Sequence, residues 1–156
     1  MANTQAMCTS FMGELLTATH NFGTAPVRAA TTADTFKAAL YLTSATINAS
    51  TTAYSSTGEV TGTNYTAGGV VVTNATAPAA TNSSATAGVA YWTPSASITY
   101  TNVTLTTAFD TVLIYNSTQS NKSVSVHTFG SQTITAGTFT LTMPTNDAST
   151  GLIRIA

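Results

Sequence analysis

The strongest constraint on the fold is an alternation of apolar and hydroxyl side chains along short segments. In "TFTLTM", Phe139, Leu141 and Met143 alternate with threonines, and "TFKAALYL" (35–42) places apolar residues at every second position. A β-strand points successive side chains to opposite faces, so this period of two predicts strands with one face against a core.

Similar segments recur along the chain, rich in threonine and in the β-branched and aromatic residues that suit strands. They predict further strands over 70–73, 90–93, 97–105, 111–116, 123–129, 132–135 and 152–155. Turn residues in "NSTQSNKS" (116–123) and "TAG" (135–137) predict hairpins between some of them. Residues 74–88 have no apolar period and predict a long exposed loop.

The N-terminal region has a different period. Met7, Phe11, Leu15, Ala18 and Phe22 recur at spacings of three and four, which predicts one amphipathic α-helix over residues 4–22. A chain of 156 residues is long enough for one sizeable core. The sequence therefore predicts a mainly β, single-domain protein over residues 1–156, with an N-terminal helix followed by a β-sandwich or jelly roll over 27–156.

The glycine-rich stretch "GEVTGTNYTAGGVVV" (58–72) raises the question of a ligand-binding loop. It has neither the lysine of a phosphate loop nor the glycine spacing of a dinucleotide fingerprint. Its glycines instead predict tight turns around residues 59–65, with positive backbone angles.

Catalytic and metal-binding groups are few. The only histidines, His20 and His127, lack an evident nucleophile and orienting acid, so both are interpreted as structural. Asp34 and Asp147 lie in turn contexts where Asp bonds its own backbone. No pair of carboxylates and no metal-ligand cluster is evident, so we expect no catalytic residue, metal or cofactor.

Composition narrows the classes of partner. Charged residues make up 6% of the chain and the net charge is -1, whereas Thr and Ser number 36 and 15. Weak charge repulsion favours self-association. The four basic residues are scattered, which argues against nucleic acid, and no apolar run is long enough to span a bilayer. The N-terminus has no secretory signal pattern, and the single cysteine, Cys8, is interpreted as a small buried residue.

Five stretches carry a family resemblance over nearly the whole chain. They are "MANTQAMCTSF", "DTFKAALYL", "TGEVTGTNYTAGGVVVTNATAPA", "AYWTPSASITYTNVTLTTAFDTVLIYNSTQSNKSVSVHTFGSQ" and "TAGTFTLTMPTNDASTGLIRIA". Together they resemble the small Thr/Ala/Ser/Gly-rich virion proteins of tailed bacteriophages, particularly those encoded beside the major capsid protein. The resemblance implies a virion component and supplies no catalytic residues.

Within that resemblance we expect a capsid decoration or cement protein on the capsid exterior, assembled in the host cytoplasm. Its expected partners are the major capsid protein and further copies of itself, as a homotrimer. The contacts are expected from the N-terminal segment and the glycine-rich loop, through Met7, Phe11, Leu15, Glu59, Val60, Asn64 and Tyr65.

Three alternatives remain open. The first is a tail, connector or fibre-attachment component of the virion. The second is a head protein that binds a host-surface glycan through Tyr54, Tyr91 and Trp92, although core packing is the simpler role for these rings. The third is a small glycosidase that uses Glu59 or Asp110.

Overall fold

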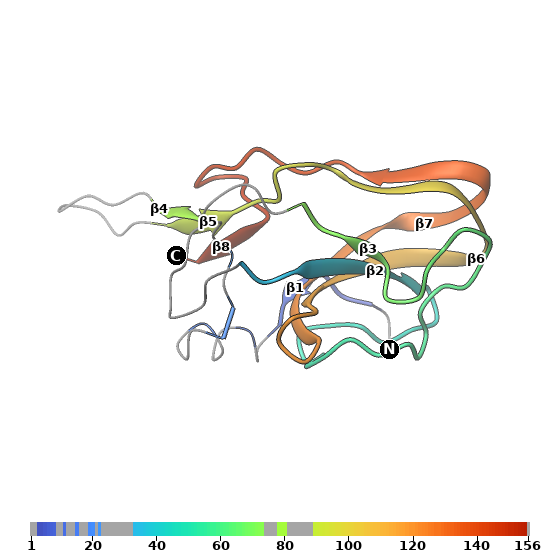
Figure 1. The fold of residues 1–156 in the computed structure, drawn as a ribbon, viewed down its shortest axis with the longest axis horizontal. Helices are drawn as coiled ribbons and strands as arrows, with labels where there is room; N and C mark the ends of the chain where they lie inside the picture. Colours follow the sequence, from blue (N-terminus) through green and yellow to red (C-terminus); the bar gives the residue numbers. More distant parts are fainter. Residues whose placement is uncertain are drawn as a thin grey trace.

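The structure is a computed structural model that describes residues 3–8, 11, 15, 19–20, 22, 33–73, 78–80 and 89–155. The described residues form the strands β1 (Ala6–Met7), β2 (Phe36–Leu42), β3 (Val70–Val71), β4 (Ala79–Ala80), β5 (Ala90–Trp92), β6 (Ile98–Asn116), β7 (Lys122–Leu141) and β8 (Ile153–Ile155). They make two antiparallel sheets, in the orders β1-β7-β6-β2-β3 and β4-β5-β8 (Figure 1). The predicted mainly β fold is confirmed.

A long ribbon of β6 and β7 dominates the larger sheet. The predicted hairpin at "NSTQSNKS" is confirmed, because Asn116 pairs with Lys122 and the turn between them uses positive φ angles at Ser120 and Asn121. The hairpin predicted at 135–137 is wrong. Gly137 pairs with Val103 inside β7, and register shifts on both sides absorb the extra residues without reversing the chain.

The ribbon bends and runs back over β2 (Figure 1). Ala38 of β2 pairs with Ile114 in one half of β6, and its carbonyl accepts a 2.8 Å hydrogen bond from the hydroxyl of Tyr100 in the other half. One residue of β2 therefore contacts both ends of β6, and the ribbon encloses part of the core.

Strand β2 is buried on both faces. Phe36, Ala38 and Leu40 are inaccessible, as predicted, but Ala39 and Tyr41 on the opposite face are inaccessible too. Beside Phe36 lie the rings of Phe22 and Trp92, with centroids 4.5 and 6.0 Å away. A strand covered on both faces keeps its apolar character at nearly every position, which explains why the run "AAL" interrupts the alternation.

The N-terminal helix predicted over 4–22 is wrong at its start. Ala6 and Met7 form β1 and pair with Val126 and Ser125, so β7 satisfies backbone groups that a helix would bond internally. Phe11 and Leu15 have helical conformation, and most of the remaining predicted helix lies outside the described residues.

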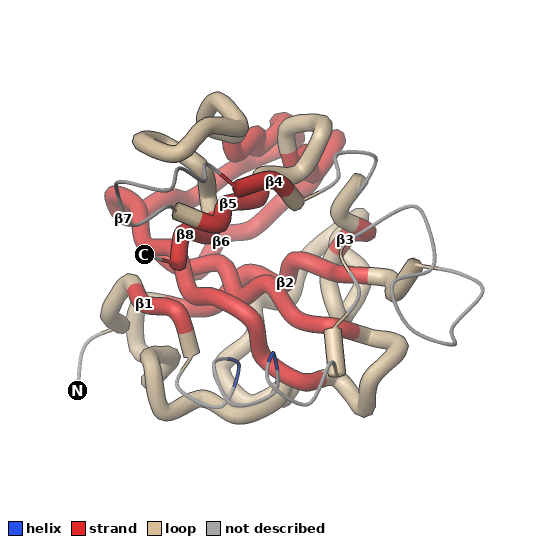
Figure 2. Tube along the Cα trace, turned by 90° about the vertical axis from the view of Figure 1, so that its left-hand side faces the viewer, coloured by secondary structure: helices blue, strands red, loops and turns tan. Residues whose placement is uncertain are grey.

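The smaller sheet lies at the end of the molecule that faces the viewer in Figure 2. It corrects part of the predicted loop over 74–88, because Ala79 and Ala80 form β4 and pair with β5. Residues 74–77 and 81–88 of that loop lie outside the described residues. Within the part of the chain that the structure describes, no helix has the length and apolar character needed to cross a membrane.

Candidate protein-interaction site

One long edge of the larger sheet is open. Strand β7 pairs with β6 along one side, whereas its other side is covered only near its start, by Thr52 and Ala53 at Lys122 and Ser123, and by β1 and Cys8 from Val124 to Val126. Among the described residues, no strand pairs with this outer side beyond Val126. Such an edge presents backbone donors and acceptors that another strand is able to pair with.

The last part of this edge is regular and alternates as predicted. We call residues 138–143 the open β7 edge: they are the last four residues of β7, which ends at Leu141, and the two residues that follow it. Thr138, Thr140 and Thr142 are exposed, while the apolar residues between them are half-buried. Phe139 fixes the strand, because its ring packs at 5.2 Å from that of Phe109 and at 5.1 Å from that of Phe129.

The open β7 edge lies in a stretch of sequence without charged residues. No Asp, Glu, Lys or Arg occurs between Lys122 and Asp147. Soluble proteins commonly protect exposed edges with charged side chains, prolines or bulges. Bulges occur earlier in β7, but the pairs from Tyr100–Phe139 to Ile98–Leu141 are continuous. Only Pro144 ends the segment, so residues 138–143 remain competent to pair with another strand.

The glycine-rich loop is organised around a buried carboxylate. Glu59 is 7% exposed, and its carboxylate accepts hydrogen bonds from the hydroxyl of Tyr54 at 2.6 Å, the hydroxyl of Tyr65 at 2.7 Å and the amide of Gly68 at 2.8 Å. These three donors replace the water that a buried carboxylate loses. Glu59 thereby ties together the two ends of the loop.

The predicted turns of this loop are confirmed. Gly58, Gly68 and Gly69 adopt positive φ angles, and so does Asn64. Gly69 also packs against β2, since an added Cβ would lie 1.6 Å from the carbonyl oxygen of Ala38. The glycines therefore serve turns and close packing.

The contact residues predicted in this loop occupy different environments. Val60 is 2% exposed, and its amide bonds the carbonyl of Leu40. Tyr65 is half-buried against Tyr100. Asn64 is exposed, and its side-chain amide donates to the carbonyl of Asn102 at 2.8 Å. Of these residues, Asn64 presents the most surface to a partner.

The N-terminal contact residues lie elsewhere. Met7 is half-buried in β1, and Leu15 is half-buried against the core. Phe11 is 1% exposed and contacts the ring of His20 at 4.9 Å. In the larger sheet, β7 and β6 lie between β1 and β2. Glu59 pairs with Tyr41 of β2. The two predicted contact groups are thus on different strands of the sheet.

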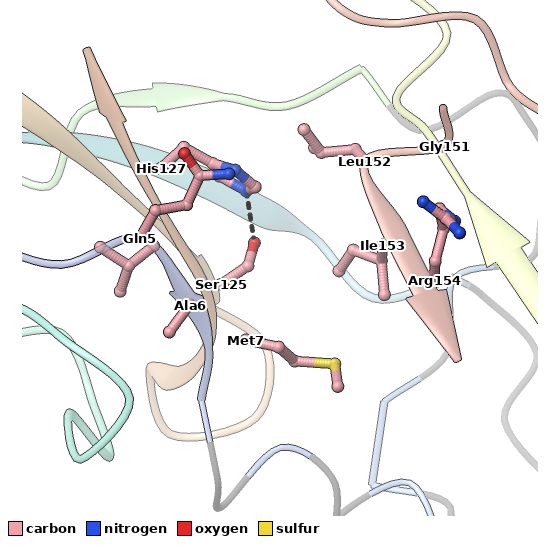
Figure 3. Close-up of a pocket in the computed structure, with 10 residues that line it drawn as sticks. Gln5, Ala6, Met7, Ser125, His127, Gly151, Leu152, Ile153 and Arg154 are labelled. Carbon is pink, nitrogen blue, oxygen red and sulfur yellow. Dashed lines mark hydrogen bonds between the residues drawn. The ribbon is translucent and has the colours of Figure 1, made fainter. Parts of the chain in front are cut away.

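A cleft of about 360 Å³ separates β1 and β7 from β8. Figure 3 shows Met7, Ser125 and His127 on one side, and Leu152 and Arg154 on the other. Ser125 Oγ and His127 Nε2 are 2.9 Å apart. Burial lowers the pKa of His127 to about 4, so its ring is neutral near pH 7.

This pair has part of the geometry of a nucleophile and its base. Ser125 is only 2% exposed, however, and among the described residues no carboxylate bonds the ring of His127. The sequence interpretation missed the contact, although the run "VSVHT" places Ser125 and His127 on one face of a strand. Strand alternation could have revealed it.

The acidic residues occupy separate sites. Asp147 accepts from the amides of Ser149 and Thr150, so its predicted turn role is confirmed. Asp34, for which the same role was predicted, is buried and accepts from the side chains of Asn116 and Gln119. Asp34 thus stabilises the β6–β7 turn, although it does not belong to the turn itself.

The remaining candidates for chemistry do not converge either. Asp110 accepts from the side chain of Asn3 at 2.7 Å, whereas Glu59 accepts from Tyr54, Tyr65 and Gly68. Within the described ranges, no group of three His, Cys, Asp or Glu residues forms a candidate metal site. Cys8 is fully buried, as predicted.

Two of the aromatic residues considered for a glycan belong to separate packing clusters, and Tyr91 is half-buried in β5. Trp92 is 3% exposed and lies 4.7 Å from the ring of Phe22. Tyr54 stacks on Tyr115 at 4.7 Å and bonds Glu59. Core packing accounts for Trp92, so these rings do not form one exposed stacking platform.

Comparison with known proteins gave no relatives: no family model, no curated protein and no solved structure matches this chain.

Proposed function

We propose that this chain is a structural protein of a tailed-bacteriophage virion, a decoration or cement protein that binds the assembled shell in many copies. The observation that carries the proposal is the open β7 edge, which has no charged residue and pairs regularly with β6 on its inner side from Phe139 to Leu141. An unprotected edge promotes aggregation in a monomeric protein, whereas in a protein that assembles it provides a strand for binding.

The surface chemistry supports the same role. With charged residues at 6%, the exterior is built mainly from hydroxyl and amide groups. Contacts between such groups depend little on ionic strength, because screening acts on charges. Many modest contacts, repeated over a lattice, would give strong binding through avidity.

The interior supports a rigid binding module. Glu59 and its three donors fix the glycine-rich loop, and the Tyr100 hydroxyl links the two ends of β6 through β2. We propose that the bent ribbon and the smaller sheet pack as a β-sandwich or jelly roll. In this proposal the major capsid protein contacts the exposed Asn64 and the accessible part of Met7.

Binding to shells that lack this protein tests the proposal. Purified protein is incubated with such shells and with shells that already carry it, and co-sedimentation is measured at several salt concentrations. We expect saturable binding in a fixed ratio to the shell subunit, little change with salt, and no further binding to the occupied shells. Absence of binding to the empty sites would overturn the proposal, and binding only to isolated tails would favour the tail alternative.

A further inference from the structure

We infer that two copies of this chain pair through their open β7 edges, antiparallel and around a two-fold axis at Thr140. The two larger sheets then form one continuous sheet across the interface. This inference rests on the proposed assembly role and names the strand that performs it.

The sequence of the edge is complementary to itself. With the axis at Thr140, Thr138 of one copy lies opposite Thr142 of the other, and Phe139 lies opposite Leu141. Directly opposed residues in an antiparallel pair share a face, so threonines meet threonines and apolar residues meet apolar residues. The half-buried Phe139 and Leu141 would thereby lose their remaining exposure to water.

The neighbouring proline selects this axis over the next one. An axis at Leu141 keeps the alternation but places Pro144 opposite Thr138. Proline is disfavoured inside a β ladder because it has no amide hydrogen, and that register would place it among the paired residues. The axis at Thr140 instead places Met143 opposite Gly137, and all the paired residues keep their donors.

Charge also favours a second copy as the occupant. Like charges opposed across a ladder destabilise it, and pairing of any charged strand with itself around a two-fold axis risks such contacts. The open β7 edge carries no charge, and the whole chain has a net charge of -1. Two copies therefore meet with little repulsion.

A cysteine at the axis tests both the pairing and its register. Opposed Cα atoms in an antiparallel pair lie about 4.5–5.5 Å apart, within the range that a disulfide spans. We expect Thr140→Cys to give a disulfide-linked dimer under mild oxidation. Thr142→Cys should not link to itself, because its copies are offset by four residues, roughly 13 Å along the strand. Thr142→Cys mixed with Thr138→Cys should link.

Two controls complete the experiment. Thr61→Cys, exposed in the glycine-rich loop, should stay unlinked, and the native Cys8 is fully buried. Thr140→Lys should shift the wild-type dimer to a monomer in light-scattering chromatography, whereas Thr61→Lys should remain a dimer. Circular dichroism identifies any variant that fails to fold.

The outcomes separate this inference from the proposed function. A wild-type monomer, a trimer unaffected by Thr140→Lys, or efficient linking of Thr142→Cys alone would overturn the pairing at Thr140. If Thr140→Cys does not fold, the mixed Thr138→Cys and Thr142→Cys sample decides the register. Binding to shells is measured separately, so the pairing could fail while the decoration role stands.

Discussion

The hydroxyl of Tyr65 donates a 2.7 Å hydrogen bond to Oε1 of Glu59 and accepts a 3.0 Å hydrogen bond from the amide of Leu40. One oxygen atom thus links the buried carboxylate of the glycine-rich loop to the backbone of β2. The Tyr65 side chain therefore couples the loop to β2.

Removal of this hydroxyl should destabilise the fold. In Tyr65→Phe, the Leu40 amide loses its acceptor and Glu59 loses one donor, which we expect to lower the free energy of unfolding by about 1–3 kcal/mol. Chemical denaturation measures the change. Tyr91→Phe is the matched control, since Tyr91 is half-buried and outside this network, and we expect an effect within about 0.5 kcal/mol. Equal effects of the two variants would contradict the structural role of Tyr65.

Substitution by alanine should affect stability strongly at one glycine and weakly at another. Gly69 has φ +71 and would place its Cβ 1.6 Å from the carbonyl oxygen of Ala38, so Gly69→Ala should cost at least about 2 kcal/mol of stability. An added Cβ at Gly130 meets nothing within 4 Å, so Gly130→Ala should change stability by less than about 1 kcal/mol. Thermal unfolding of both variants decides this; a harmless Gly69→Ala would show that the loop does not pack on β2 in this way.

Alkaline pH should destabilise the protein through its buried and half-buried tyrosines. Burial, with a further contribution from the nearby Glu59, raises the pKa of Tyr65, Tyr54 and Tyr100 above the ordinary value of about 10. A raised pKa means that the unfolded chain ionises first. The contribution of these tyrosines to stability should therefore be constant below pH 10 and should fall as the pH rises above 10. Denaturation midpoints, measured with tyrosine absorbance, should show this loss; tyrosines that ionise near pH 10 while the protein stays folded would contradict it.

Acidic pH should act through His127. Its pKa is about 4 in the fold because burial disfavours the charged ring, whereas the unfolded value is about 6.5. The unfolded chain binds the proton first, so this contribution is fully present above pH 6.5 and is lost as the pH falls toward 4. The loss should reach roughly 2 kcal/mol. In His127→Gln, the free energy of unfolding should change less steeply with pH between pH 4 and pH 6.5. An unchanged slope would mean that another group causes the pH dependence.

The local patterns predicted strands well, but they did not give strand length or topology. Thr138 to Met143 alternate as expected, because that alternation is a local property of the sequence. The "TAG" triplet has turn residues, yet its chain continues because β6 offers partners on both sides of the bulge. The helical spacing of Met7 and Phe11 was overridden at Met7 by pairing with β7, a contact between residues far apart in sequence.

The candidate site was harder to predict for the same reason. Whether residues 138–143 lie at the centre or the edge of a sheet depends on which other strands pair with them, and no local pattern contains that information. Glu59 and Val60 were expected at a contact surface, but bonds to Tyr54, Tyr65 and Leu40 hold them in the interior. The lack of charged residues around residues 138–143 was visible in the sequence. It indicates an interaction site only because these residues lie at the edge of the sheet.

The abundance of this chain in purified phage particles tests the central claim most directly. Quantitative mass spectrometry gives its copy number relative to the shell subunit. A lattice-wide decoration protein should occur in a fixed ratio to that subunit, in many copies for each particle. Complete absence from the particles would contradict the proposed role, and a small number set by a single vertex would reassign the chain to the tail or its connector.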